Sequence, residues 1–193
     1  MHTFNGTIIE AVYGSLEGKA RAIAKTMIYA FLYAGGDGKL GLIVSGKRDA
    51  DLGKRLREAF MKRIPGLGAL TKRIERQWEY TYEKTGKGYI MGLDGRFVYA
   101  EQKRLSLNYL LQSAEKITCS LAVMWGMAKM ESEGIWYQPL IFYHDEVQLM
   151  VKEEDSIRAS EIWKEAFKEG PKLLNVVIMD GDSKIGNNWY ETH

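Results

Sequence analysis

The sequence predicts an α+β fold in which a helical lobe is followed by antiparallel hairpins. Residues 17–33 and the basic stretches after them have the pattern of helices. Two later segments, 90–99 and 141–151, each hold two short apolar runs on either side of a turn signal, which is typical of β-hairpins. A long helix, predicted over about 103–132, separates the two hairpins.

Two breaker signals divide the helical lobe. The first helix ends at the cluster Gly35-Gly36-Asp37-Gly38. Two basic helical stretches follow, and Pro65-Gly66 separates them. In the first hairpin, Asp94-Gly95 marks the bend.

The last predicted elements are a helix and a strand. The helix covers about 156–169, with Asp155 or Ser156 as its cap, and Gly170-Pro171 stops it. Residues 174–180 predict a strand. The apolar side of the helix consists of Ile157, Ile162, Trp163, Ala166 and Phe167.

Four side chains on the first helix indicate a site for a nucleotide. Residues four apart share one face of a helix, and the face here carries two cations followed by two phenol rings. Arginine and lysine hold phosphate oxygens, and a phenol ring stacks on any base. The alternative is an ordinary amphipathic helix with solvated cations and core tyrosines. The four residues are Arg21, Lys25, Tyr29 and Tyr33.

The second hairpin places carboxylates at its bend. Its sequence, IFYHDEVQLMV, has apolar runs on both sides of His144, Asp145 and Glu146. Mg²⁺ prefers oxygen ligands and often takes only one or two from protein, with substrate phosphates supplying others. Asp and Glu are also ordinary turn residues, so the hairpin alone is weak evidence for a metal site. The hypothesis of a nucleotide and metal site depends on the cationic helix and the hairpin together.

These motifs resemble the A family of DNA polymerases, the DNA polymerase I type. Its fingers helix carries Arg, Lys, Tyr or Phe, and Tyr-Gly at intervals of four, and its palm hairpin carries His-Asp-Glu. The order of motifs, including the closing GNNWYETH, is most similar to the replicative polymerases of T-odd phages. Ala34 departs from the family, which usually has glycine there. Further matching stretches are His2-Thr3, LDGR at 93–96 and LNYLLQSA at 107–114.

The resemblance implies a partial right-hand polymerase fold. Residues 1–86 would form a fingers-like helical lobe, and residues 87–193 a palm-like portion. The family's Asp-x-Ser-x-x-Glu strand, which carries its other principal metal ligand, has no counterpart in this sequence. The thumb and the proofreading exonuclease have none either. We therefore expect the C-terminal part of a split or truncated polymerase, completed by an N-terminal fragment that supplies the missing aspartate, the thumb and possibly the exonuclease.

The resemblance also implies roles at a two-metal nucleotidyl-transfer site. Asp145 would bind Mg²⁺ with Glu146 in support, and His144 would touch the primer end. The incoming dNTP would be held by Arg21 and Lys25, helped by His2. Tyr29 would pack against the sugar, and Tyr33 would stack near the templating base.

The long helix is predicted to follow the primer-template DNA. Arg104, Asn108 and Gln112 are four apart and face one way. In the family, Asn and Gln at the matching places contact the minor groove, whose acceptors occupy similar places in every correct base pair; Arg104 is added from spacing alone. The alternative is a polar face toward water. A different stripe is expected to be buried: Leu107, Leu111, Ala114 and Leu121.

Composition and charge agree with a cytoplasmic protein that binds nucleic acid. No apolar run approaches the roughly 20 residues of a membrane helix, and no signal-peptide pattern is present. Cys119, the single cysteine, is expected to be a packed thiol. The formal net charge is only +2, but residues 47–76 hold ten cations against four acids, whereas 131–193 hold six against thirteen. The basic segment could follow a phosphate backbone or simply be solvated.

Two other functions remain open at this point. The chain could be a noncatalytic DNA-binding remnant of a polymerase, or a regulatory subunit that docks on a polymerase core. Replacing Asp145 distinguishes a noncatalytic remnant from part of an active polymerase. The remnant would support no DNA synthesis with a partner polypeptide, so the replacement could abolish none. Replacing Arg21 and Lys25 separates the second, because a docking subunit would act without them.

Overall fold

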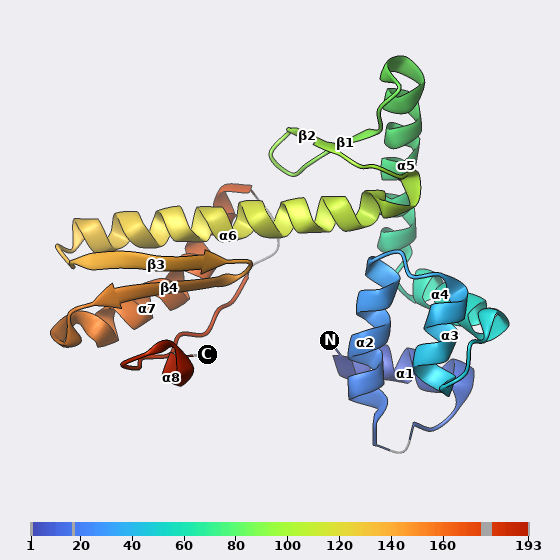
Figure 1. Ribbon diagram of the computed structural model, residues 1–193, viewed down its shortest axis with the longest axis horizontal. Helices are drawn as coiled ribbons and strands as arrows, with labels where there is room; N and C mark the ends of the chain where they lie inside the picture. The colour runs from blue at the N-terminus through green and yellow to red at the C-terminus, as the bar shows by residue number, and fades with distance from the viewer. Residues whose placement is uncertain (1, 17, 175–178, 193) are drawn as a thin grey trace. The chain divides into compact units, whose positions relative to one another are not determined.

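Most of the described residues lie in helices, and two small antiparallel sheets complete this part of the chain (Figure 1). The computed structural model describes residues 2–16, 18–174 and 179–192, with side chains from Gly6 onward. The predicted α+β class is confirmed. The elements are α1 (His2–Tyr13), α2 (Ala20–Leu32), α3 (Asp37–Ser45), α4 (Ala50–Arg63), α5 (Pro65–Thr85), β1 (Tyr89–Met91), β2 (Phe97–Tyr99), η1 (Lys103–Leu105), α6 (Ser106–Ser132), β3 (Tyr137–Tyr143), β4 (Glu146–Val151), η2 (Glu153–Asp155), α7 (Ser156–Glu169), η3 (Gly170–Leu174) and α8 (Trp189–Thr192), where η denotes a 3₁₀ helix.

The chain divides into two compact units. The first unit comprises residues 1–91 and 97–111, and the second comprises residues 92–96 and 112–193. The long helix α6 contributes its first residues to the first unit and the rest to the second.

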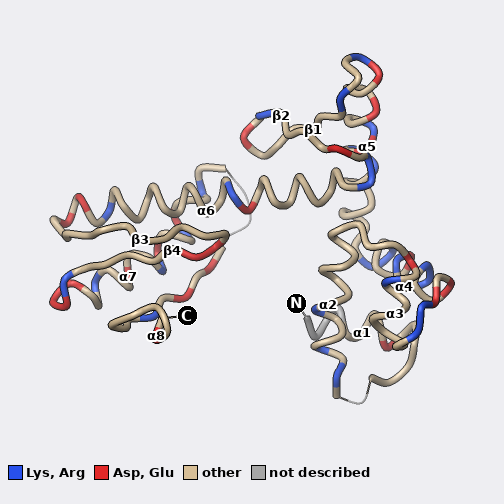
Figure 2. Tube along the Cα trace, viewed as in Figure 1, with Lys and Arg blue, Asp and Glu red and all other residues tan. Residues whose placement is uncertain are grey.

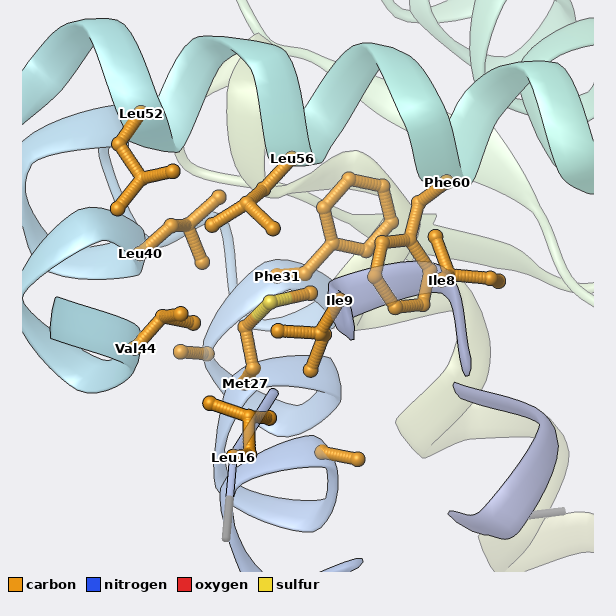
Figure 3. Close-up of a cluster of buried hydrophobic side chains, with 12 residues drawn as sticks. Ile8, Ile9, Leu16, Met27, Phe31, Leu40, Val44, Leu52, Leu56 and Phe60 are labelled. Atoms are coloured by element: carbon orange, nitrogen blue, oxygen red, sulfur yellow. The ribbon is translucent and has the colours of Figure 1, made fainter. Parts of the chain in front are cut away.

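The main core of the first unit lies among α1, α2, α3 and α4. Figure 3 shows aliphatic side chains from these helices around the two rings of Phe31 and Phe60, whose centroids are 6.1 Å apart. Complete burial of side chains of this size stabilises a fold by roughly 1.5–3 kcal/mol each. Five large core side chains are completely buried: Ile9, Met27, Leu40, Leu56 and Phe60.

Two glycines let α3 and α4 pack with their backbones close together. A Cβ atom on Gly41 would lie 1.9 Å from the Asp49 carbonyl oxygen, and one on Gly53 would lie 1.8 Å from the Asp37 carbonyl oxygen. Neither position can therefore hold a side chain without moving a helix. Asp49 also caps α4, because its Oδ1 accepts the Leu52 N–H at 2.8 Å.

A second core of the first unit fixes hairpin β1–β2 against α5. Ile90 of β1 is completely buried with Ile74 of α5 and Leu107 of α6. The Trp78 Nε1–H donates to the Ala100 carbonyl at 2.7 Å, and the Tyr89 N–H donates to the Thr81 hydroxyl at 2.7 Å. One face of the hairpin is therefore held by both packing and hydrogen bonds.

The second unit packs hairpin β3–β4 against α6 and α7. Tyr137 pairs with Val151 at one end of the antiparallel ladder and Tyr143 with Glu146 at the other, with an irregularity at Leu140. Val147, Leu149 and Val151 alternate along β4 and pack on the buried cluster. The buried cluster comprises Ala122, Val123, Met130, Ile135, Ala159, Ile162, Trp163 and Ala166.

Several predicted elements are confirmed, with shifted ends. Both predicted hairpins form, and Pro65 is the first residue of α5, where its missing N–H costs nothing. The first predicted helix begins at Ala20 rather than at residue 17. Cys119 is buried, as expected for a packed thiol. Within the described ranges, no helix is both long enough and apolar enough to cross a bilayer.

Four predictions at side-chain level are wrong. Ile157 is 70% exposed because it lies on the outer side of α7, and Leu111 is also exposed on α6. No side chain caps α7: Asp155 makes no capping bond, and the Ser156 hydroxyl donates to the Glu153 carbonyl instead. Asp155 is the last residue of a 3₁₀ turn, η2, and Ser156 follows it; the Ser156 N–H donates to the Glu153 carbonyl, so backbone bonding covers the helix start.

The predicted strand over 174–180 falls mainly outside the described residues. Residues 175–178 are not described, and Leu174 belongs to the 3₁₀ helix η3 rather than to a strand. The sequence did not predict helix α3, which begins at Asp37, inside the glycine cluster.

The end of α2 has a Schellman motif with an alanine in the position that favours glycine. The Gly35 N–H donates to the Ala30 carbonyl at 2.7 Å, and the Ala34 N–H donates to the Phe31 carbonyl at 3.1 Å. Ala34 has φ +54°, in the left-handed region. A Cβ atom raises the energy of this conformation, so the departure from glycine at this position strains the helix end.

We predict that Ala34→Gly raises the free energy of unfolding by about 1 kcal/mol, because it removes this strain. The neighbouring change Gly35→Ala is the matched control and should destabilise the chain, since its Cβ would lie 2.6 Å from the Ala30 oxygen. Urea denaturation followed by circular dichroism measures both. A destabilising Ala34→Gly would contradict the strained helix end.

Candidate functional site

The cationic side chains of α2 lie on its exposed face. The opposite face is buried and consists of Ala24, Met27, Ala30 and Phe31. Because the helix must bury this stripe, Arg21, Lys25 and Tyr29 are directed outward. Tyr29 is 50% exposed and Tyr33, at the C-cap, is 53% exposed. The alternative in which both tyrosines are core residues is therefore wrong.

The two cations of this face have no acidic partner in the part of the chain that the structure describes. Arg21 and Lys25 form no ion pair there, whereas Arg57 on α4 pairs with Asp37. An arginine and a lysine one turn apart, both exposed, can accept an anionic ligand without first breaking an internal ion pair. Exposed phenol rings then continue the face toward the helix end.

Arg57 holds the end of α2 in place. Its Nε donates to Asp37 Oδ1 at 2.7 Å, its Nη2 donates to the Gly35 carbonyl at 2.6 Å, and its guanidinium carbon lies 5.3 Å from the Phe31 ring centroid. One side chain thus ties the turn after α2 to α4. The position of Tyr33 depends on this turn because the residue caps the helix just before it.

The structure does not test the predicted role of His2. The residue opens α1, whose backbone is described there, but the His2 side chain lies outside the described side chains. Its contribution to a nucleotide site stays a prediction.

The carboxylate hairpin has a two-residue turn. Tyr143 and Glu146 are the last paired residues, so His144 and Asp145 form the bend. His144 has φ +52°, an uncommon conformation for a residue with a Cβ atom, and its ring lies edge-on to Tyr143 at 4.2 Å between centroids. A glycine at this position would relieve the backbone strain. The presence of histidine instead is consistent with a functional requirement for the imidazole.

The two carboxylates of the hairpin have different surroundings. Asp145 is exposed and receives no hydrogen bond from the described residues. Glu146 is half-buried, and its Oε1 accepts the Gln148 Nε2–H at 2.5 Å. Gln148 in turn accepts the Thr192 hydroxyl at 3.1 Å, which connects the hairpin to α8. Glu146 is therefore connected through Gln148 to α8, while Asp145 is available to a ligand.

Helix α6 lies beside the hairpin. The Lys116 ammonium is 3.6 Å from the centroid of the Phe142 ring. Burial raises the pKa of the Cys119 thiol, and the nearby carboxylates of Glu115 and Asp145 raise it further. The Asp145 charge therefore acts on this helix, and the thiol stays protonated at neutral pH.

The described residues contain no cluster of three or more potential metal ligands. The hairpin does supply two adjacent carboxylates, one of them without a protein partner within the described ranges. Mg²⁺ accepts such a set when water and phosphate oxygens supply its other ligands. The donor chemistry therefore fits one side of a magnesium site.

The predicted DNA-facing residues divide between two elements. Asn108 and Gln112 lie one turn apart on α6. Asn108 is half-exposed and Gln112 is exposed. Arg104 lies on η1 instead, and its Nε donates to the Gln102 side chain at 2.8 Å. The expectation that Arg104 continues the face of one α-helix is wrong, because α6 begins only at Ser106.

The basic segment is exposed on α4 and α5. Figure 2 shows the cations concentrated on α4 and on the loop before it. Arg57 belongs to this segment and pairs with Asp37. Seven further cations of the segment are exposed on the two helices: Lys54, Arg55, Lys62, Arg63, Lys72, Arg73 and Arg76.

Sequence reasoning missed two positioning residues. Arg57 is one of ten cations in the basic segment, but its place beside Leu56 and three residues before Phe60 indicates a partly buried side of α4. Gln148 lies in a stretch that the sequence predicts only as an apolar run. Glu146 and Gln148 are two apart on a strand and so share a face, which was an available signal.

The sequence matches DNA polymerase family A over residues 2–191. It is 31% identical to the DNA-directed DNA polymerase of Enterobacteria phage T3 over 98% of this chain, and 31% identical to that of Escherichia phage T7 over the same share. The DNA-directed DNA polymerase of Escherichia phage Phieco32 is 33% identical over 88% of the chain. The chain spans only 28–29% of the length of these relatives.

A solved structure has a similar fold. It is the POL domain of Pol1 from M. smegmatis in complex with DNA primer-template and dNTP, with a TM-score of 0.68 and 16% sequence identity. The similarity covers 86% of this chain and 31% of that one.

We predict that Arg57→Met loosens the end of α2. The change keeps the apolar stem but removes the hydrogen bonds to Asp37 and Gly35, so the free energy of unfolding should fall by about 1–2 kcal/mol. Arg55→Met, on the same helix and exposed, is the control and should stay within about 0.5 kcal/mol of the parent chain. Equal effects of the two changes in urea denaturation would contradict the anchoring role.

Proposed function

The chain belongs to DNA polymerase family A, and on that premise we propose that it supplies the nucleotide-binding helix and one carboxylate hairpin of a template-directed DNA polymerase site. Residues 1–86 take the fingers-like role and residues 87–193 the palm-like role. The observation that carries the proposal is the exposed face of α2, which presents Arg21, Lys25 and Tyr29 outward.

The proposed reaction adds a deoxynucleotide to a primer. The primer 3′ hydroxyl loses its proton to water as its oxygen attacks the α-phosphorus of a dNTP. A new phosphodiester bond forms, and the bond to the bridging oxygen breaks to release pyrophosphate. Catalysis of this kind depends on positioning and charge neutralisation. Arg21 grips phosphate oxygens as a fork, and Lys25 neutralises the negative charge that builds up on the leaving pyrophosphate.

The remaining residues of the site position the substrates. Tyr29 packs against the sugar, and Tyr33 stacks near the templating base. His144 contacts the primer end from the strained turn. On α6, Asn108 and Gln112 contact the minor groove of primer-template DNA, where their amides test base-pair geometry rather than sequence. His2 assists at the triphosphate, and Arg104 contacts DNA from η1.

Magnesium fits the hairpin by the chemistry of its donors. Asp145 would hold the ion and Glu146 would support it, and Mg²⁺ bound there supplies charge neutralisation for the phosphoryl transfer. Gln148 keeps Glu146 in one orientation through the 2.5 Å bond. The hairpin register fixes the carboxylates next to each other at one end of β4.

Completion of the site needs further protein. We propose a complementing polypeptide segment that carries the other metal-binding aspartate, the thumb and possibly an exonuclease. The chain's 28–29% share of its relatives' length is compatible with this arrangement. Within the described residues, β3 and β4 pair only with each other, so the outer edge of each strand is open to a further strand.

We predict that Arg21→Ala and Lys25→Ala each weaken dNTP binding to the purified chain by about 10-fold or more, because each removes a charge-assisted contact of roughly 1.5–3 kcal/mol. Isothermal titration calorimetry measures the affinity. Lys164→Ala is the control, since this exposed lysine lies on α7 in the other unit and should leave the affinity unchanged. Equal losses in all three variants would indicate general charge attraction and refute a built site on α2.

A further inference from the structure

The outward side of hairpin β1–β2 is apolar, although it faces solvent. Tyr89 lies opposite Tyr99, and Met91 lies opposite Phe97, so these four side chains share one face. Their exposed fractions include 64% for Phe97, 51% for Tyr99 and 48% for Met91. We call these four residues the aromatic face. The other side of the hairpin carries Ile90 and Val98, which pack on the core.

Solvation alone does not explain this face. An antiparallel hairpin with one buried side normally has polar residues on the other. Here the Tyr89 ring stands edge-on to its neighbours, 5.7 Å from the Tyr99 centroid and 6.4 Å from that of Phe97. The three rings form one contiguous cluster. Clustered exposed apolar side chains mark a surface that another molecule covers.

Two exposed lysines lie shortly before hairpin β1–β2 in the chain. Lys84 lies near the end of α5 with its Nζ 5.8 Å from the centroid of the exposed Tyr80 ring, and Lys87 is two residues before Tyr89. Neither lysine forms an ion pair with any residue in the described ranges. The nearby carboxylate of Glu79 is already paired with Lys103 at 2.8 Å. Phosphates could therefore approach the lysines directly.

We infer that the aromatic face binds single-stranded DNA, with bases stacked on Tyr99 and Phe97 and with phosphates near Lys84 and Lys87. Aromatic residues on adjacent strands of a sheet can stack two or three bases, and stacking tolerates any base. The rings match the bases of a nucleotide chain, and the unpaired cations match its phosphates. The inference rests on the proposed function, in which the unpaired template is the available single strand.

The test measures binding of the full chain to two labelled probes by fluorescence anisotropy. One probe is a 20-nucleotide oligo-dT, and the other is an abasic deoxyribose-phosphate oligomer of the same length. The paired change Phe97→Leu with Tyr99→Leu removes the rings but keeps apolar side chains. We expect it to weaken oligo-dT binding by at least about 10-fold and to leave abasic binding unchanged.

Matched variants separate stacking from other effects. Phe97→Trp keeps a ring and should retain oligo-dT affinity. Tyr190→Leu replaces a tyrosine that is 94% exposed in the other unit and should also have no effect. Lys84→Gln combined with Lys87→Gln should weaken the binding of both probes. It should also lower the slope of log affinity against log salt concentration by about the amount expected for one to two phosphate contacts.

Three results would overturn the inference. The first is unchanged oligo-dT affinity in the double leucine variant, and the second is an equal loss for the abasic probe. The third is that the double leucine variant keeps its affinity for oligo-dT but loses an association between copies of the chain, which would make the face a protein interface. Titration of dNTP with the same variant keeps this test separate from the proposed function: its dNTP affinity should equal that of the parent chain, whichever way the DNA result falls.

Discussion

The requirement that α2 bury one side determines the arrangement of the proposed nucleotide-binding face. Ala24, Met27, Ala30 and Phe31 fill the core between α1, α3 and α4, and the helix has one orientation that satisfies them. The cations and phenols four residues apart are then necessarily exposed. Packing energy, rather than any interaction among the polar residues themselves, holds the face in its geometry. A substitution in the core should therefore disturb the site without touching it.

Hydrogen bonds fix the ends of the two candidate site elements. Arg57 secures the turn after α2, and the series from Thr192 through Gln148 to Glu146 secures the start of β4. In both places the strained residue, Ala34 or His144, lies next to such an anchor. Left-handed conformations of this kind persist when the surrounding structure determines them. Each of these two elements is thus anchored by hydrogen bonds within its own unit.

The sequence predicted the features that depend on local signals. Turn residues identified both hairpins, Pro65 identified the start of α5, and a spacing of four identified the exposed face of α2. Helix α3 was missed because it begins within a glycine cluster that favours a break. Its stability comes from close packing at Gly41 and Gly53, which depends on contacts with α4 that local patterns do not contain.

Side-chain partners were harder to predict than elements. The place of Arg104 on a 3₁₀ turn and the exposure of Ile157 depend on where neighbouring helices begin and which side they bury. The pairing of Arg57 depends on a residue twenty positions earlier. The predicted roles at the nucleotide and the metal depend on ligands and further protein, so chemistry and family resemblance carry them rather than contacts within this chain.

Primer extension tests the central claim most directly. The purified chain is combined with a polypeptide that carries the remainder of a family A polymerase, and synthesis is followed on a primer-template with dNTPs and Mg²⁺. The account predicts extension by the combination and a loss of at least about 100-fold with Asp145→Asn. Equal extension with Asp145→Asn, or robust extension by the chain alone, would contradict it.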